Sequence, residues 1–384
     1  MNDSSSDRFA PGEASSFTSP QVDAARRAGN RLQLPGGEIL LPKVFGFCRG
    51  VERALEMLDA AVDGHRGSGK RLVLLGEIIH NPWVNKYFQS RGVRVLSPAQ
   101  LRDLEQYVRA GDCAIIPAFG VPLSVQQRLA QIGCETVDTS CGDVRRLWKW
   151  AEQAVAEGYG VLIFGRASHD ETVVTKSRLA AAGGRYVVAG NLDEVRAFAD
   201  LITGRRTEQF GELFGPAATN ADELAPLRRL AQVSQTTMLY DETLEVRAVL
   251  AKAYEEAFGA DGLAERLRFQ PTVCRATQAR QSAAVELCRG ACDLTVVVGG
   301  FGSSNTRHLY ELARKYAPGY LIESAEAIRS AGRLETYDFE AGEPAVVEDW
   351  LPDRRPLRIA VLAGESSPEI VVGEVLEKLA AFLR

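Results

Sequence analysis

Short runs of apolar, often β-branched residues recur along most of the chain and alternate with segments of helical character. In one such segment, Val51, Ala54, Leu55, Leu58 and Val62 lie three or four positions apart, which is the spacing of one face of an α-helix. The apolar runs have the length and composition of buried strands. They cover residues 38–47, 71–77, 113–120, 159–166, 230–237, 294–300, 319–324 and 358–365.

Strands that alternate with helices predict an α/β fold with mostly parallel sheets. A strand, a cysteine at its tip and a long α/β stretch recur three times, so we predict three similar α/β units around one centre. Residues 1–35 are rich in Ser, Asp, Ala and Pro and predict a disordered N-terminal arm. The expected units are 36–141, 142–272 with a polar surface insertion near 203–223, and 273–355, with 356–384 as a strand and helix closing back on the first.

The composition argues against several classes of protein. The formal net charge is −5 and no basic run is present, so we expect no nucleic-acid partner. No apolar stretch reaches the length of about 18 residues that a transmembrane helix needs, and the N-terminus lacks the apolar core of a signal peptide. We therefore expect a cytoplasmic protein with no membrane association that acts on a small molecule.

Polar residues and cysteines gather where the predicted strands end. Parallel sheets bind their ligands at the carboxyl ends of the strands, so side chains at these tips are candidates for a site. This clustering favours a binding or catalytic function. The tip residues are Cys48, His80, Phe119, Cys141, His169, Glu171, Thr236, Cys274, Ser303, Ser304, Asn305 and Ser366.

Three cysteines, Cys48, Cys141 and Cys274, occupy such tips. Thiolates from separate tips could hold an iron–sulfur cluster, zinc or cuprous copper. A 4Fe–4S cluster with three protein thiolates keeps one iron open to bind a substrate oxygen. The residues alone are equally compatible with three small buried apolar side chains, because free cysteine is among the most buried residue types.

The remaining four cysteines are expected to lie in the core. Cys113 begins a predicted strand and Cys134 precedes one. Cys288 and Cys292 lie four positions apart, which leaves a two-thiolate metal site as the alternative there. His65 lies in a polar loop, and we predict that it is solvated.

Eight short segments, taken in order, resemble the LytB/IspH family, whose activity is that of 4-hydroxy-3-methylbut-2-enyl diphosphate reductase. The resemblance runs from about residue 38 to the C-terminus. Its segments are GFCRGVERAL (46–55), EIIHNPWV (77–84), VDTSC (137–141), SHDE (168–171), SQTT (234–237), VCRATQARQ (273–281), SSNT (303–306) and AGESSPE (363–369).

The resemblance implies a trefoil of three α/β units around a 4Fe–4S cluster whose ligands fall on Cys48, Cys141 and Cys274. It implies that the open iron binds the allylic hydroxyl of the substrate. Two electrons and protons then remove this hydroxyl as water, which gives isopentenyl and dimethylallyl diphosphates. An external one-electron donor such as ferredoxin or flavodoxin is expected.

Two groups of site residues follow from the same resemblance. The family's acid falls on Glu171 and its neighbouring threonine on Thr236, and burial of such a carboxyl favours its protonated form. The remaining positions carry hydrogen-bond donors suited to a diphosphate. These expected diphosphate contacts are His80, His169, Ser303, Ser304, Asn305 and Ser366.

The chain departs from the family pattern at Phe119. The family has Ala-His-Gly where this chain has Ala118-Phe119-Gly120, and the segment after the second cysteine reads GDVRR (142–146) instead of the family's Pro-Leu-Val-Thr-Lys. Losing one hydrogen bond to a charged group costs about 1.5–3 kcal/mol, or tenfold to over a hundredfold in affinity.

Several functions therefore stay open. One is an authentic reductase in which Arg145 or Arg166 compensates for the histidine missing at Phe119. Another is a paralogue that reduces a less anionic substrate. A non-catalytic iron–sulfur redox sensor and a zinc-binding regulatory module are alternatives from other classes. The presence of Glu171 and Thr236 favours catalysis, because a sensor needs no dehydroxylating acid.

Overall fold

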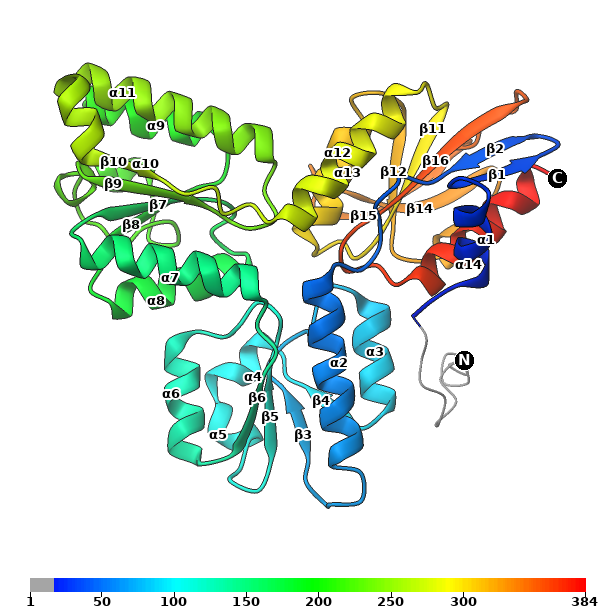
Figure 1. Ribbon diagram of the computed structural model, residues 1–384, viewed down its shortest axis with the longest axis horizontal. Coiled ribbons are helices and arrows are strands. Elements are labelled where there is room, and N and C mark those ends of the chain that lie inside the picture. The colour runs from blue at the N-terminus through cyan, green and yellow to red at the C-terminus, as the bar shows by residue number, and fades with distance from the viewer. Residues whose placement is uncertain (1–16) are drawn as a thin grey trace. The chain divides into compact units, whose positions relative to one another are not determined.

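The computed structural model describes residues 17–384 as a mixed α/β protein with several mostly parallel sheets (Figure 1). This agrees with the α/β class predicted from the sequence. The chain divides into two compact units. Unit 1 comprises the described residues up to Leu55, Glu77–Val95 and Arg275–Arg384, and unit 2 comprises Glu56–Gly76 and Leu96–Cys274.

Unit 1 is built on a five-stranded sheet in the order β1-β2-β16-β11-β12. Every neighbouring pair is parallel except the β1–β2 hairpin. In the central pair the register sets Val298 opposite Ala363, so both strands end at the same edge. The strands are β1 (Arg31–Leu34), β2 (Gly37–Leu40), β11 (Leu294–Val298), β12 (Gly319–Ile322) and β16 (Leu357–Ala363).

Helices cover both faces of this sheet, as a parallel sheet requires. Val296 and Val298 pack with α1 (Pro20–Arg27) and α14 (Glu369–Phe382). Val297 points to the other face and packs with α12 (Arg275–Arg289) and α13 (Ser304–Ala313). The remaining elements of unit 1 are α3 (Pro82–Ser90), β4 (Val93–Val95), η3 (Ala325–Ala327) and the antiparallel sheet β13 (Ile328–Ser330), β14 (Arg333–Asp338) and β15 (Glu343–Glu348).

Unit 2 contains two parallel sheets. In the first, β3 (Leu72–Leu74), β5 (Cys113–Ile116) and β6 (Glu135–Asp138) are neighbours in that order. One face packs against short helices through residues such as Leu104, Val125 and Leu129. These helices are α4 (Pro98–Arg102), α5 (Leu104–Tyr107) and α6 (Leu123–Ile132).

The second sheet of unit 2 has the order β10-β9-β7-β8. Phe164 faces the helices α9 and α11, whereas Ile163 faces α7 and α8. Its strands are β7 (Gly160–Phe164), β8 (Tyr186–Ala189), β9 (Leu230–Ser234) and β10 (Leu267–Phe269). Its helices are α7 (Gly142–Ala156), α8 (Asp170–Ala181), α9 (Leu192–Thr203), α10 (Phe210–Leu213), η2 (Ala225–Leu227) and α11 (Tyr240–Arg266).

Each of the eight apolar runs overlaps a strand, namely β2, β3, β5, β7, β9, β11, β12 and β16. The predicted helix over 51–62 is α2 (Arg49–Gly64), and Ala54, Leu55, Leu58 and Val62 on its predicted face are buried. No helix within residues 17–384 is both long and apolar enough to span a bilayer.

The prediction of a disordered arm through residue 35 is wrong for α1 and β1. Ser19 caps α1 by accepting a hydrogen bond from the N–H of Val22, and the fully buried Val22 and Ala25 pack in the core with α14. The few apolar residues of this polar segment fall on one helix face, which average composition does not reveal. The part of the arm at residues 1–16 lies outside the described residues.

The polar stretch 203–223 packs onto the second sheet of unit 2, instead of forming a surface insertion. Phe210 and Phe214, whose ring centroids lie 5.2 Å apart, are buried in the same core cluster as Phe198. Thr219 forms a bridge with Val187 of β8. Two aromatic residues therefore anchor a segment whose average polarity suggested exposure.

Phe214→Ala is expected to lower the free energy of unfolding by about 3–5 kcal/mol, because it leaves a cavity where a buried ring packed. The exposed Glu208→Ala in the same segment should change stability by less than about 0.5 kcal/mol. Denaturant unfolding followed by circular dichroism measures both. Equal effects of the two substitutions would show that the segment does not pack as described.

Candidate functional site

Cys48, Cys141 and Cys274 share one structural feature: each directly precedes a helix, α2, α7 and α12 respectively. The carbonyl of Cys48 accepts the N–H of Glu52 at 2.9 Å, and that of Cys141 accepts the N–H of Arg145 at 3.0 Å. A helix N-terminus carries unpaired N–H groups and partial positive charge, which favours a thiolate over a thiol. The helix start therefore favours thiolate at all three positions, and burial opposes it at Cys141.

The surroundings of Cys141 link it to the tip of β5 and to Glu171. Its N–H donates to the carbonyl of Ala118 at 2.9 Å. Burial raises the pKa of the Cys141 thiol, while the backbone N–H groups of Asp143 and Val144 oppose this rise. The negative charges of Asp143 and Glu171 raise it further.

The backbone leading to Cys48 is fixed by Arg280 of α12. Arg280 is only 5% exposed, and its Nη2 donates to the carbonyls of Gly46 and Phe47, at 2.8 Å in each case. Burying the Arg280 charge costs desolvation free energy, and the hydrogen bonds to these two carbonyls offset part of that cost. The same bonds hold the backbone before Cys48 in one position. Sequence reasoning included Arg280 only inside a matched segment and gave it no role.

Glu171 is held by Thr236 at both carboxylate oxygens. The backbone N–H of Thr236 donates to Oε1 at 2.7 Å and its hydroxyl donates to Oε2 at 2.5 Å. Glu171 is only 1% exposed, so these two bonds replace the water that a buried carboxylate loses. The carbonyl of Thr236 in turn accepts the N–H of Cys274 at 3.0 Å, which joins the acid to a candidate sulfur ligand.

Gln235 fixes the turn that carries Thr236. Its Oε1 accepts the N–H of Arg166 at 3.2 Å and the hydroxyl of Thr172 at 3.3 Å. Its Nε2 donates to the Thr237 hydroxyl at 2.7 Å. No local sequence pattern signals this role; it follows from the burial of the Gln235 amide, because buried polar groups are hydrogen-bonded in folded proteins.

Phe119 lies beside His169, one of the expected diphosphate contacts. Their ring centroids are 5.9 Å apart in an edge-to-face arrangement, and Nδ1 of His169 accepts the N–H of Glu171 at 3.3 Å. Only glycine fits at position 120 of this tip, because its φ is +80° and a Cβ there would meet the Trp148 ring at 2.5 Å. The apolar ring of Phe119 therefore lies against His169, a residue that is expected to bind the diphosphate.

The two arginines considered as replacements for the missing histidine differ in their surroundings. Arg145 Nη2 lies 2.7 Å from Oδ2 of Asp138, so its charge is already balanced by a carboxylate. Arg166 is exposed. If Arg145 replaces the missing histidine, the diphosphate must compete with Asp138 for the Arg145 guanidinium.

In unit 1, His80, Ser303 and Ser366 meet at the edge where β11 and β16 end. The Ser366 hydroxyl lies 3.3 Å from the carbonyl of His80 and 3.4 Å from the Ser303 hydroxyl. Ser303 also caps α13 by accepting the N–H of Thr306 at 3.3 Å. The His80 ring lies with Nδ1 at 3.1 Å from Oε2 of Glu77. Three of the predicted residues are thus neighbours.

Ser304 and Asn305, in the first turn of α13, complete this group. Oδ1 of Asn305 accepts the N–H of Glu365 at 3.1 Å. Within residues 17–384, however, Nδ2 of Asn305 and the hydroxyl of Ser304 are buried and have no hydrogen-bond partner. Buried polar groups are rarely left unsatisfied without a reason, and the start of a helix favours an anion. The arrangement can therefore bind a phosphate group.

The predicted site residues divide between the two units. Cys48, His80, Ser303, Ser304, Asn305 and Ser366 belong to unit 1. Phe119, Cys141, His169, Glu171, Thr236 and Cys274 belong to unit 2.

Comparisons with known proteins give a consistent result. The family model described as LytB protein matches residues 39–380. The 4-hydroxy-3-methylbut-2-enyl diphosphate reductase of Thermosynechococcus vestitus is 35% identical over 369 residues, which cover 95% of this chain and 90% of the relative. The protein of the same name from Gloeobacter violaceus is 34% identical over 372 residues, covering 94% and 87%.

Two solved structures share the fold. One, described as the structure of (E)-4-hydroxy-3-methyl-but-2-enyl diphosphate reductase, is 24% identical, with a TM-score of 0.53 over 89% of this chain and 99% of that chain. The other, a reductase from Plasmodium falciparum, is 20% identical, with a TM-score of 0.63 over 88% and 86%. The fold and family expected from the sequence motifs are confirmed, and the chain belongs to the LytB family.

Proposed function

We propose that this protein is a 4-hydroxy-3-methylbut-2-enyl diphosphate reductase. It removes the allylic hydroxyl of its substrate as water, with two electrons and two protons, and releases isopentenyl and dimethylallyl diphosphates. The observation that carries this proposal is the buried Glu171, bonded at both oxygens to Thr236, which in turn bonds to Cys274. A proton donor fixed beside a sulfur ligand fits a reductive dehydroxylation.

The cofactor in this proposal is a 4Fe–4S cluster held by Cys48, Cys141 and Cys274. Their position before three helix N-termini suits thiolate ligands, so the residues fit the group. When bound, the cluster supplies single electrons and an open iron that acts as a Lewis acid on an oxygen. We propose an external one-electron donor, ferredoxin or flavodoxin by analogy with the family.

Glu171 is the proposed proton donor and Thr236 its partner. The Thr236 hydroxyl can donate or accept, so it can bond to the carboxyl in either protonation state. After the proton leaves, the backbone N–H of Thr236 still donates to Oε1 and stabilises the carboxylate. The pair therefore holds the acid in one place throughout a proton transfer.

The diphosphate is proposed to bind at the start of α13. The Ser304 hydroxyl and the Asn305 amide supply two buried donors, and Ser303, Ser366 and His80 lie beside them. His169 is a further proposed diphosphate contact. Neutral donors with a helix N-terminus hold an anion without a fixed countercharge.

A second candidate function is favoured by Phe119. Its ring lies against His169, where a diphosphate contact is expected, so the chain could instead reduce a less anionic hydroxylated compound. The redox sensor and the zinc-binding module are disfavoured, because neither makes use of a buried acid bonded to Thr236.

Glu171→Gln is expected to lower kcat by about 10²–10⁴-fold, because the amide keeps the shape of the side chain but is no acid. The assay is anaerobic oxidation of reduced viologen on addition of the diphosphate substrate, at equal iron content. The adjacent, exposed Asp170→Asn serves as the matched control and should retain wild-type turnover. Full activity of Glu171→Gln would remove Glu171 from the reaction.

Ser304→Ala is expected to raise KM about tenfold or more, because a hydrogen bond to a charged phosphate is lost. It should not lower the stability of the ligand-free protein, since the hydroxyl has no partner in the described part of the chain. Ser303→Ala should instead cost about 1 kcal/mol of stability through loss of the α13 cap. Thermal unfolding and steady-state kinetics measure the two effects, and an unchanged KM would argue against a phosphate contact.

Phe119→His separates the two candidate functions. If the substrate is the diphosphate, the wild type turns it over, and the new imidazole lowers KM by about tenfold or more. If the wild type shows no turnover of the diphosphate and Phe119→His gains it, the protein is a diverged paralogue. KM and kcat for both proteins decide between these outcomes.

A further inference from the structure

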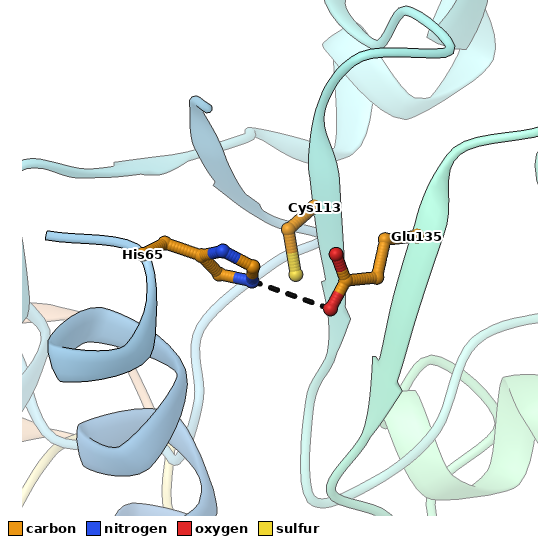
Figure 2. A group of neighbouring side chains, drawn as sticks. All are labelled: His65, Cys113 and Glu135. Carbon is orange, nitrogen blue, oxygen red and sulfur yellow. Dashed lines mark ion pairs between the residues drawn. The ribbon is translucent and has the colours of Figure 1, made fainter. Parts of the chain in front are cut away.

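A cluster of metal-ligating side chains lies in unit 2, away from the residues proposed for catalysis. His65, Cys113 and Glu135 point toward one another, His65 from a loop after a helix and the other two from neighbouring strands (Figure 2). Cys113 and Glu135 are the first residues of β5 and β6. Phe119 and Cys141 follow the ends of the same strands, so this cluster occupies the opposite edge of the sheet.

The spacing of the ligand atoms suits a tetrahedral metal ion. Nε2 of His65 lies 3.3 Å from Oε1 of Glu135, and the three ligand atoms, with Sγ of Cys113, all lie within 4.8 Å of one another. Zinc binds imidazole nitrogen at about 2.0–2.1 Å and carboxylate oxygen at about 2.0–2.2 Å, which sets these atoms about 3.3–3.5 Å apart at a tetrahedral angle. The observed separation already has this value.

Backbone contacts fix all three residues in place. The parallel register sets Cys113 directly opposite Glu135. The N–H of His65 donates to the carbonyl of Ala61 at 3.1 Å, and the His65 carbonyl accepts the N–H of Ser68 at 3.0 Å. Cys113 is fully buried, whereas the Glu135 side chain is 42% exposed, so an ion can enter from solvent.

We propose that His65, Cys113 and Glu135 bind a zinc ion that joins the turn after α2 to the edge of the sheet. A set with one nitrogen, one thiolate and one carboxylate suits zinc, whereas magnesium and calcium prefer oxygen alone. Three protein ligands leave the fourth position to water. The expectation that His65 is solvated is wrong, because its side chain is only 16% exposed, and Cys113, although a core residue as predicted, also faces this group.

Two neighbouring features limit the affinity. Nζ of Lys70 lies 2.6 Å from Oε2 of Glu135, which orients the carboxylate but places a positive charge beside the ion. Burial raises the pKa of the Cys113 thiol to about 11, so binding must release its proton. Lys70 contacts Oε2 of Glu135, so Oε1 stays available to the metal. Binding of the metal replaces the ion pair between His65 and Glu135.

The test uses the full chain, purified anaerobically with its iron retained, and one equivalent of Zn²⁺. X-ray absorption at the zinc edge is specific to this element, so bound iron does not interfere. We expect one zinc per chain, with one sulfur at about 2.3 Å and nitrogen or oxygen ligands at about 2.0–2.2 Å. His65→Asn and Cys113→Ser should each weaken binding at least tenfold, whereas Cys134→Ala, at a thiol one residue before Glu135, should leave it unchanged.

Hydrogen exchange provides a second measurement that does not depend on a buried substitution. Zinc should slow exchange of the amides of residues 65–71 in the wild type and have no effect there in His65→Asn. Absence of zinc binding, or binding that His65→Asn leaves unchanged, overturns the proposal. Zinc that binds only after iron is lost and disappears in Cys141→Ser also overturns it. None of these readouts depends on turnover, so the site stands or fails separately from the proposed reductase activity.

Discussion

The paired hydrogen bonds between Glu171 and Thr236 are the constraint on which the rest of the candidate site depends. A carboxyl that is only 1% exposed loses its water, so its two oxygens must find partners within the protein. Thr236 supplies both from one residue, and its own carbonyl holds Cys274. These bonds therefore couple the position of the acid, the shape of the tip after β9 and the placement of a candidate sulfur ligand. A shift of one displaces the others.

The chemistry gathers at strand ends for a general reason. In a parallel sheet all strands end at one edge, and the helices that follow begin there with unpaired N–H groups. The three candidate cysteines, the acid and the serine-rich start of α13 each lie at the junction between a strand and the helix that follows it, a position that favours anionic groups, whether thiolate or phosphate. The opposite edge of the β3-β5-β6 sheet carries a different set, with Cys113 and Glu135 opposite each other and His65 beside them.

The sequence was sufficient to predict the α/β class and eight strands, because buried strands leave a local apolar signature. Ordered motifs then indicated the family and the candidate site residues. Local patterns could not reveal contacts made across the fold. Arg280 bonds to Gly46 and Phe47 more than 230 positions away, and Gln235 supports Thr236 through partners from another strand tip. The same limit applies to α1 and to the Phe210–Phe214 pair. Their apolar residues lie in polar segments, and only the elements that they pack against identify them as core residues.

In the proposed reaction, an iron–sulfur cluster supplies electrons and the Glu171–Thr236 pair supplies a proton to a diphosphate substrate. The most direct measurement is oxidation of reduced viologen by anaerobically purified wild-type protein, with iron and acid-labile sulfide determined on the same sample. We predict about four iron and four sulfide per chain, no oxidation beyond background without substrate, and rapid oxidation when 4-hydroxy-3-methylbut-2-enyl diphosphate is added. A protein with its full iron and sulfide content that does not respond to this substrate would contradict the account.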